Sequence, residues 1–438
     1  MLQIALLLCG RNFIRRNLPV LMLAGSLWGF LGALILADGM LGAQYFPLRL
    51  FGWLLLSEGL VMLMASSGAR GAKRGIYLFR GGAAVAVALL ILSGLSGSNL
   101  LLAIILGFIC FLSGTFVIAS AWVVRYPHWR RALAGGTFQI IFAIALFQPY
   151  PTHHDGTVPQ FIGVLMILSA VSFIRLSRRL RHLAPGQTIF NLQGADRNEI
   201  RRGGDLFTHN EPKTDDEPHV LRVLVWTPEG SSGDTPVPRP ILNRYIAAVD
   251  TSGVISTGHA ALEMQDVYIS LYPAVDIDRS PSEFFRTLRA VQENDVPGRF
   301  QPSYAAESAG WCEADRQVCF HAFSAGSLRA FSQMYRQREV YNLTWRNCSS
   351  SVAYALEAAL DGVLDNRNGW GMFSRLLFRP ELWIAAQLRK RAVTMAWTPG
   401  LVLDYARALH GIVHPVRLSW FRKPAEGARS AEESAGER

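Results

Sequence analysis

The chain has 438 residues, of which 50% are hydrophobic and 17% charged, and its mean hydropathy is +0.20. This composition excludes an intrinsically disordered or collagen-like chain, and it is apolar for a soluble enzyme. The apolar residues are concentrated in roughly the first 175 positions, so the sequence predicts a membrane-embedded part followed by a water-soluble part.

The formal net charge is +10, from 43 Lys and Arg against 33 Asp and Glu. Much of the excess lies at the ends of apolar stretches, where basic residues fix membrane orientation, so we expect a lipid bilayer and no nucleic acid as partner. The cysteines are odd in number and scattered, which argues against a disulfide framework. They are Cys9, Cys110, Cys312, Cys319 and Cys348.

Six apolar stretches in the first part approach the about 20 residues that cross a hydrocarbon core. No small-residue cleavage site follows the first of them, so we expect an anchored protein rather than a signal peptide. An all-α bundle of six transmembrane helices is predicted over residues 1–182. The stretches are 18–38, 46–66, 76–96, 100–123, 132–149 and 159–176.

Basic residues alternate between the loops of this bundle. They precede the first stretch, lie between the second and third and between the fourth and fifth, and follow the sixth, while the other three loops carry no Lys or Arg. The positive-inside rule then places both termini in the cytoplasm of a multi-pass membrane protein. The basic residues are Arg11, Arg15, Arg16, Arg70, Lys73, Arg74, Arg125, Arg130, Arg131, Arg175, Arg178, Arg179 and Arg181.

A repeat runs through the same region. A Leu-Ser pair recurs every 56 residues, at Ser57, Ser113 and Ser169, always in an even-numbered stretch. This predicts a helical hairpin used three times, with glycines that allow close helix approach. Glu58, an acidic residue deep in a stretch, is either a packing residue or functional. The glycines are Gly25, Gly29, Gly32, Gly81, Gly82, Gly107 and Gly114.

Six spans built as three hairpins, with Gly and Ser in the even helices, resemble the HdeD/DUF308 family of bacterial inner-membrane proteins over residues 10–180. The resemblance implies an inner-membrane location and a role in resistance to acid and other stress. It leaves open whether the helices only anchor the protein or also carry a small solute.

Residues 183–219 are polar and read as a linker, residues 220–422 as a globular α+β domain, and residues 423–438 as a disordered tail. The stretch Trp370–Pro399 mixes aromatic and basic residues, and it suits either an anionic membrane surface or packing on the domain itself. We expect strands at His219–Pro228, Val254–Met264, Val267–Tyr272 and Gln317–Phe323, helices at Pro281–Asn294, Ser324–Arg338 and from Cys348, an extended piece at Glu339–Arg346, and a strand or short helix at Ile241–Val249.

Two short motifs carry the chemistry of the domain. His259 follows Gly258 on a predicted strand, and Cys348 begins a predicted helix. A cysteine in the first helical turn meets the positive end of the helix dipole, which favours the thiolate, and an imidazole from a neighbouring strand can take its proton. The free N–H groups of the same turn can stabilise an oxyanion. A buried, inert cysteine is the alternative.

The order of these motifs, Gly-His on a strand and then Asn-Cys-Ser before a helix, resembles circularly permuted papain-like hydrolases of the NlpC/P60 type over residues 220–365. The resemblance implies Cys348 as nucleophile, His259 as base and a third polar residue that orients the imidazole. Ser270 is our choice by alternation, with Tyr268 and Glu263 as rivals. Asn347 either assists the oxyanion or caps the helix.

The predicted function is therefore a cysteine hydrolase or acyl transferase that acts on an amide or ester bond of a protein, peptide or lipid acyl substrate, as a monomer or homo-oligomer. The rival interpretation is a non-enzymatic stress-protection protein or small-solute channel with a partner-binding soluble domain. Cys312, Cys319 and His321 lack the paired spacing and the fourth ligand of a zinc site, so no metal or other cofactor is predicted.

Overall fold

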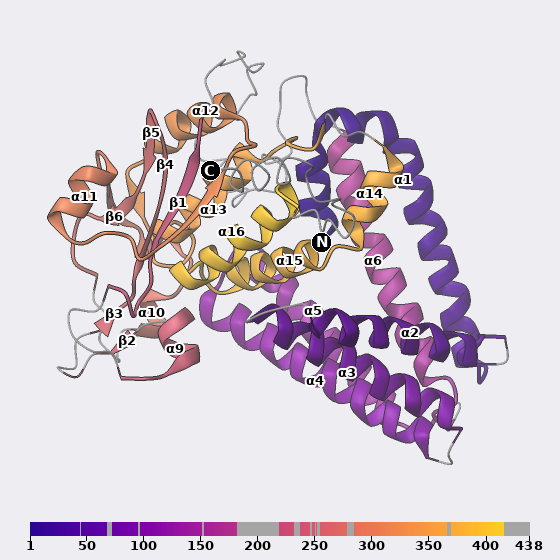
Figure 1. Cartoon of the computed structure of the whole chain (residues 1–438). Coiled ribbons are helices and arrows are strands. Elements are labelled where there is room, and N and C mark those ends of the chain that lie inside the picture. Colours follow the sequence, from indigo (N-terminus) through magenta and orange to yellow (C-terminus); the bar gives the residue numbers. More distant parts are fainter. Residues whose placement is uncertain are drawn as a thin grey trace, which may run out of the picture.

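A computed structural model of the chain describes residues 1–43, 45–67, 72–94, 97–150, 153–181, 219–231, 237–245, 248–249, 251, 255–277, 284–365 and 369–415 (Figure 1). The predicted linker lies outside the described residues except for its last position, and the predicted tail lies wholly outside them.

Six helices make up the N-terminal part, and each contains most of a predicted stretch, although α1 begins at Leu2, well before the predicted start at 18. Among the described residues, five of them are long and apolar enough to cross a membrane, and the third has a shorter apolar segment, Tyr77–Ser93. The helices are α1 (Leu2–Met40), α2 (Leu48–Ser67), α3 (Ala72–Ser93), α4 (Ser98–Val124), α5 (Trp129–Phe147) and α6 (Thr157–Arg181).

The helices pack in the pairs α1–α6, α2–α3 and α4–α5, not in the predicted hairpins of first with second, third with fourth and fifth with sixth. The reason is the position of the glycines within each repeat, because a Cβ at one glycine would lie about 3 Å from the backbone of the partner helix. Gly82 was wrongly included, since a Cβ there would have no atom within 4 Å. The facing pairs are Gly32 with Gly163, Gly59 with Gly81, and Gly114 with Gly136.

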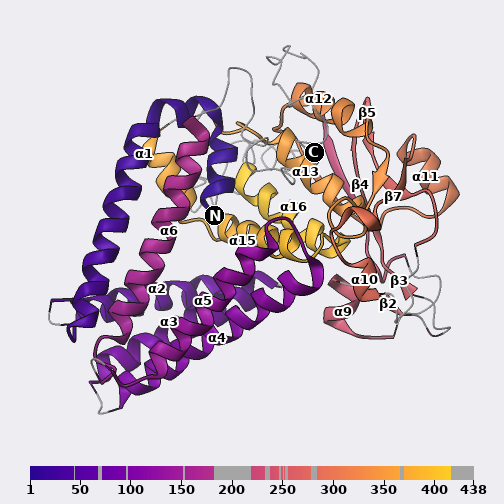
Figure 2. The same ribbon diagram turned by 180° about the vertical axis from the view of Figure 1, so that it is seen from behind.

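The α1–α6 pair runs at a steep angle to the other four helices (Figures 1 and 2). Among the described residues, five helices are therefore candidate membrane spans, and the six N-terminal helices do not form one parallel bundle. Within α2, Glu58 accepts a hydrogen bond from Arg80 of α3 at 2.7 Å, which accounts for this acidic residue as one partner of an ion pair.

The C-terminal part is α+β, as predicted. Four antiparallel strands form its main sheet in the order β5-β4-β1-β8, with Trp226 opposite His259 in the β1–β4 register. A smaller antiparallel sheet has the order β6-β7-β9. The strands are β1 (Leu221–Trp226), β4 (His259–Met264), β5 (Val267–Ile269), β6 (Leu271–Pro273), β7 (Val296–Phe300), β8 (Arg316–Phe320) and β9 (Val340–Tyr341), and β2 (Ala248–Val249) pairs with β3 (Ile255–Ser256).

Helices α12, α13 and α16 pack against the strands and one another, and most of α13 is buried. Helices α14 and α15 contribute Phe373, Leu376, Leu382 and Ala385 to the same core, so packing on the domain is the observed role of these residues. The helices are α9 (Pro240–Tyr245), α10 (Phe284–Thr287), α11 (Tyr304–Gly310), α12 (Ala325–Arg336), α13 (Cys348–Ala359), α14 (Trp370–Leu377), α15 (Pro380–Thr394) and α16 (Pro399–Val413).

The predicted helix Pro281–Asn294 is wrong for most of its described length. The structure has only the single turn α10 and a 3-10 turn at Gln292–Asn294. The Asn294 side chain donates to the carbonyl oxygens of Arg286 and Arg289, which in a continuous helix would accept from backbone N–H groups instead. Strand β7 and helix α11 were not predicted, and β7 contains a proline and a glycine, which are rare in strands.

Candidate active site

Cys348 is the first residue of α13, and the residue before it sets the start of that helix. The side chain of Asn347 accepts from the Ser350 backbone N–H at 2.8 Å, and the Ser350 hydroxyl accepts from the Asn347 N–H at 2.8 Å. The Asn347 amide group also donates to the carbonyls of Leu343 and Trp397. Both of its donors are thus engaged, and the structure shows Asn347 as the N-cap of α13.

The thiol of Cys348 faces strand β4, where it accepts a hydrogen bond from the backbone N–H of Ala260, the neighbour of His259. The side chain remains partly exposed. Burial raises the pKa of the thiol above its ordinary value, and the hydrogen bonds from Ser349 and Ala260 only oppose this effect. Burial of the thiol thus opposes the effect of the helix terminus, which favours the thiolate.

His259 is the first residue of β4, and it is 4% exposed. The strand begins after Gly258, whose φ is +68° and whose Cβ position would collide with the carbonyl oxygen of Trp226, so only glycine fits there. The Nε2 atom of His259 lies 2.9 Å from the hydroxyl oxygen of Ser270. The residue chosen by alternation thus lies in hydrogen-bond contact with the imidazole.

A second group on the same nitrogen was missed by the sequence reasoning. The carboxylate of Glu307, on α11, lies 3.3 Å from Nε2 of His259 and is 5% exposed as a residue. It accepts hydrogen bonds from Tyr268 at 2.6 Å and Tyr272 at 2.7 Å. The Tyr272 ring in turn stacks on the imidazole with centroids 4.1 Å apart. Glu307 therefore contacts both an edge atom of the imidazole and the ring that covers its face.

Of the two rivals for the third position, Tyr268 lies in the site but donates to Glu307. Glu263 forms an ion pair with Arg222 across the β1–β4 ladder and takes no part in the described contacts of His259. No motif announces Glu307, because it lies in a short helix that the sequence did not predict, and it meets His259 only through tertiary packing.

Nε2 of His259 lies within reach of two oxygens, those of the Ser270 hydroxyl and the Glu307 carboxylate. Burial lowers the pKa of His259 to about 3, so loss of hydration outweighs the attraction of the nearby carboxylate, and the imidazole is neutral at neutral pH. The resting protein consequently holds a neutral imidazole at the start of β4.

Two further aromatic rings lie near the imidazole. The ring centroid of Trp226 lies 5.4 Å from that of His259, and the partly exposed Trp311 lies 6.5 Å away and stacks on Trp226. Within the described ranges, no cluster of three or more His, Cys, Asp or Glu side chains is placed to hold a metal ion. The arrangement offers a thiol, a proton acceptor and a buried carboxylate, which together suit attack on a carbonyl carbon.

Comparison with known proteins returns no relative for this chain: it matches no protein-family model, no curated protein and no solved structure.

Proposed function

We propose that the chain is a membrane-anchored cysteine hydrolase that forms an acyl-enzyme at Cys348. The observation that carries this proposal is the joint placement of three groups. The thiol of Cys348 lies by the backbone N–H of Ala260, the adjacent His259 begins the same strand, and Glu307 and Ser270 lie beside Nε2 of its ring. A nucleophile, a base and an orienting group in this order are the requirement for acyl transfer.

In the proposed reaction, Nδ1 of His259 takes the thiol proton as the sulfur attacks the substrate carbonyl. Glu307 stabilises the imidazolium that forms, and backbone N–H groups at the start of α13 stabilise the oxyanion. The imidazolium then returns the proton to the departing amine or alcohol, leaving a thioester on Cys348. Water, deprotonated by the same nitrogen, hydrolyses the thioester and restores the thiol.

The same proposal includes the permuted papain-like fold and the cytoplasmic face of a bacterial inner membrane. A Cys helix packed on an earlier His strand supports the fold. Ile4 to Cys9 lie inside the C-terminal domain, and α6 ends beside the same core. This supports a location of the C-terminal domain on the same side of the membrane as the start of α1 and the end of α6. The basic loops support the cytoplasm as that side. Proteins, peptides and lipid acyl groups are the substrate classes that fit this location.

A thiol-directed activity probe tests the proposal. We expect a fluorescent acyloxymethyl ketone to label the wild-type protein, Cys348→Ala to abolish the labelling, and His259→Ala to slow it by about 100-fold, since a general base contributes 10²–10⁴-fold. Cys319→Ala is the matched control, because Cys319 is a partly buried thiol on β8. Labelling that survives in Cys348→Ala would contradict the proposal and favour the non-enzymatic interpretation.

A further inference from the structure

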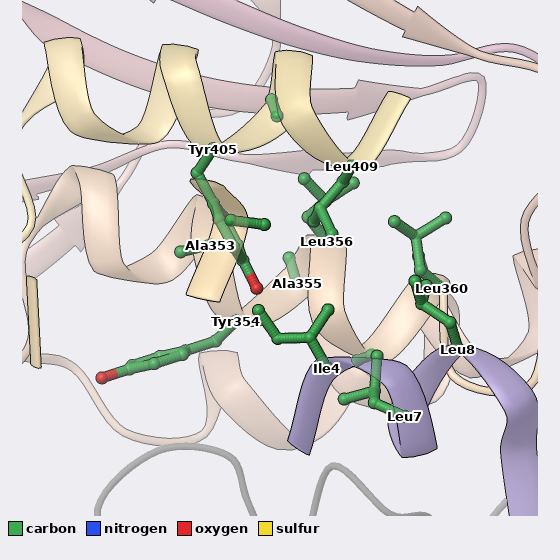
Figure 3. Packing of buried hydrophobic residues seen from close by; sticks show 14 of the residues in the cluster. Ile4, Leu7, Leu8, Ala353, Tyr354, Ala355, Leu356, Leu360, Tyr405 and Leu409 are labelled. Atoms are coloured by element: carbon green, nitrogen blue, oxygen red, sulfur yellow. The ribbon is translucent and has the colours of Figure 1, made fainter. Parts of the chain in front are cut away.

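The first residues of α1 do not belong to the membrane-facing part of the fold. Each residue from Ile4 to Cys9 is at most 3% exposed, and all of them belong to the hydrophobic core of the C-terminal domain. Figure 3 shows Ile4, Leu7 and Leu8 against side chains of α13 and α16. The α13 and α16 residues labelled there are Ala353, Tyr354, Ala355, Leu356, Leu360, Tyr405 and Leu409, of which Leu360 directly follows α13.

A sharp turn at Gly10 joins this buried segment to the rest of α1. Gly10 has φ +78°, and a Cβ there would lie 2.7 Å from the Cα of Gly362. The loop after α13 is hydrogen-bonded to the segment, because the N–H of Gly362 donates to the carbonyl of Leu7 at 2.8 Å and the N–H of Leu364 to that of Leu8 at 2.9 Å. The C-terminal end of the Cys348 helix is therefore fixed to α1.

The N-terminal end of α13 is tied to a different membrane helix. The N–H of Ala290 donates to the carbonyl of Val124, the last residue of α4, at 2.7 Å. Two residues earlier, the carbonyl of Leu288 accepts from the Thr344 hydroxyl at 2.7 Å, and Thr344 lies in the loop that leads into α13. A hydrogen-bonded path of a few residues thus joins α4 to the turn that presents the nucleophile.

We infer that α1 and α4 position the Cys348 helix, so that a change in the arrangement of the membrane helices alters the reactivity of the thiol. The consequence for catalysis rests on the proposed function. The inference deepens that function by naming the lipid bilayer as a regulator of the site at Cys348. Tilting α1 relative to α4 would shift or rotate α13 as a rigid body against β4, where the backbone N–H of Ala260 lies beside the thiol.

Bilayer thickness provides the test, because a helix adapts to a thicker or thinner bilayer by tilting. The full chain is reconstituted in dimyristoleoyl, dioleoyl or dierucoyl phosphatidylcholine, and the rate of alkylation by iodoacetamide is measured on the peptide that contains Cys348. We expect the rate constant to differ between lipids by about threefold to tenfold, the range that such coupling produces.

A six-residue Gly-Ser linker inserted between Gly10 and Arg11 should remove this dependence on lipid, since it leaves the buried segment in place but disconnects it from α1. The same linker inserted after Gly42 is the control, because a Cβ at Gly42 would meet no atom within 4 Å, and this variant should behave as the wild type. If the first variant fails to fold, Ala290→Pro serves instead, because it removes the N–H that donates to Val124.

Equal alkylation rates of the wild type in the three lipids would overturn the inference, and so would a dependence that persists in a folded uncoupled variant. Alkylation reports the surroundings of the sulfur and needs no turnover. A lipid dependence of the alkylation rate without any acyl-enzyme would therefore reject the proposed function and keep the coupling. An acyl-enzyme together with equal alkylation rates in the three lipids would reject the coupling and keep the proposed function.

Discussion

Replacing Glu307 with glutamine is expected to slow acylation of Cys348 by about 100-fold or more, because loss of the carboxylate that orients a catalytic imidazole is among the costliest changes in such sites. The amide keeps the size of the side chain and one accepting oxygen, so one of the two tyrosines, Tyr268 or Tyr272, loses its acceptor. It removes the negative charge that stabilises the imidazolium formed when His259 takes the thiol proton. The measurement is the burst of p-nitrophenol released from an activated ester.

Glu263→Gln is the matched control for this experiment. Glu263 lies on the same strand as His259 but pairs with Arg222 in the sheet, away from the imidazole, so its variant should acylate within about twofold of the wild type. Equal rates in Glu307→Gln and the wild type would show that Ser270 alone orients the imidazole. The pH dependence of acylation should also change in Glu307→Gln, which loss of packing alone would not produce.

Acidification is expected to destabilise the C-terminal domain through His259. The folded protein holds this imidazole neutral, with a pKa of about 3 against 6.5 as its ordinary value. The unfolded chain binds a proton below pH 6.5 that the folded chain does not bind until about pH 3, so this contribution to stability is present above pH 6.5 and is lost as the pH falls toward 3. The full loss is about 5 kcal/mol, at about 1.4 kcal/mol per pKa unit.

The measurement for this prediction is the free energy of unfolding in urea, followed by tryptophan fluorescence in detergent micelles. Between about pH 7 and about pH 4.5 the wild type should lose about 3 kcal/mol more than His259→Gln, whose side chain does not titrate. If both proteins lose stability in parallel, the imidazole is not held neutral in the fold.

The parts of the site that follow from local sequence were predictable. Cys348 at a helix start and His259 after Gly258 depend on capping and strand patterns within a few residues, and the alternation of a strand selects Ser270. Glu307 could not be found in this way. It lies on a short helix with no strong periodicity, and its contact with His259 is formed only when α11 packs on the sheet.

In the membrane part, too, the features that follow from local sequence were predictable and the tertiary contacts were not. Apolar length located all six helices, but it could not say which helix packs on which, because that depends on glycines facing each other across helices distant in sequence. The segment Leu2–Cys9 was assigned with the transmembrane domain, because an apolar run is equally suited to lipid and to a protein interior. Only the tertiary structure shows that these residues complete the core beneath α13.

The most direct test of the account is to trap the acyl-enzyme. The full chain is mixed with an activated ester and quenched in acid, and the acylated peptides are identified by mass spectrometry. We expect a thioester on the peptide that contains Cys348, which forms far more slowly in His259→Ala and then disappears by hydrolysis. Acylation spread equally over the thiols that solvent can reach, and unaffected by His259→Ala, would contradict the claim that Cys348 is an activated nucleophile.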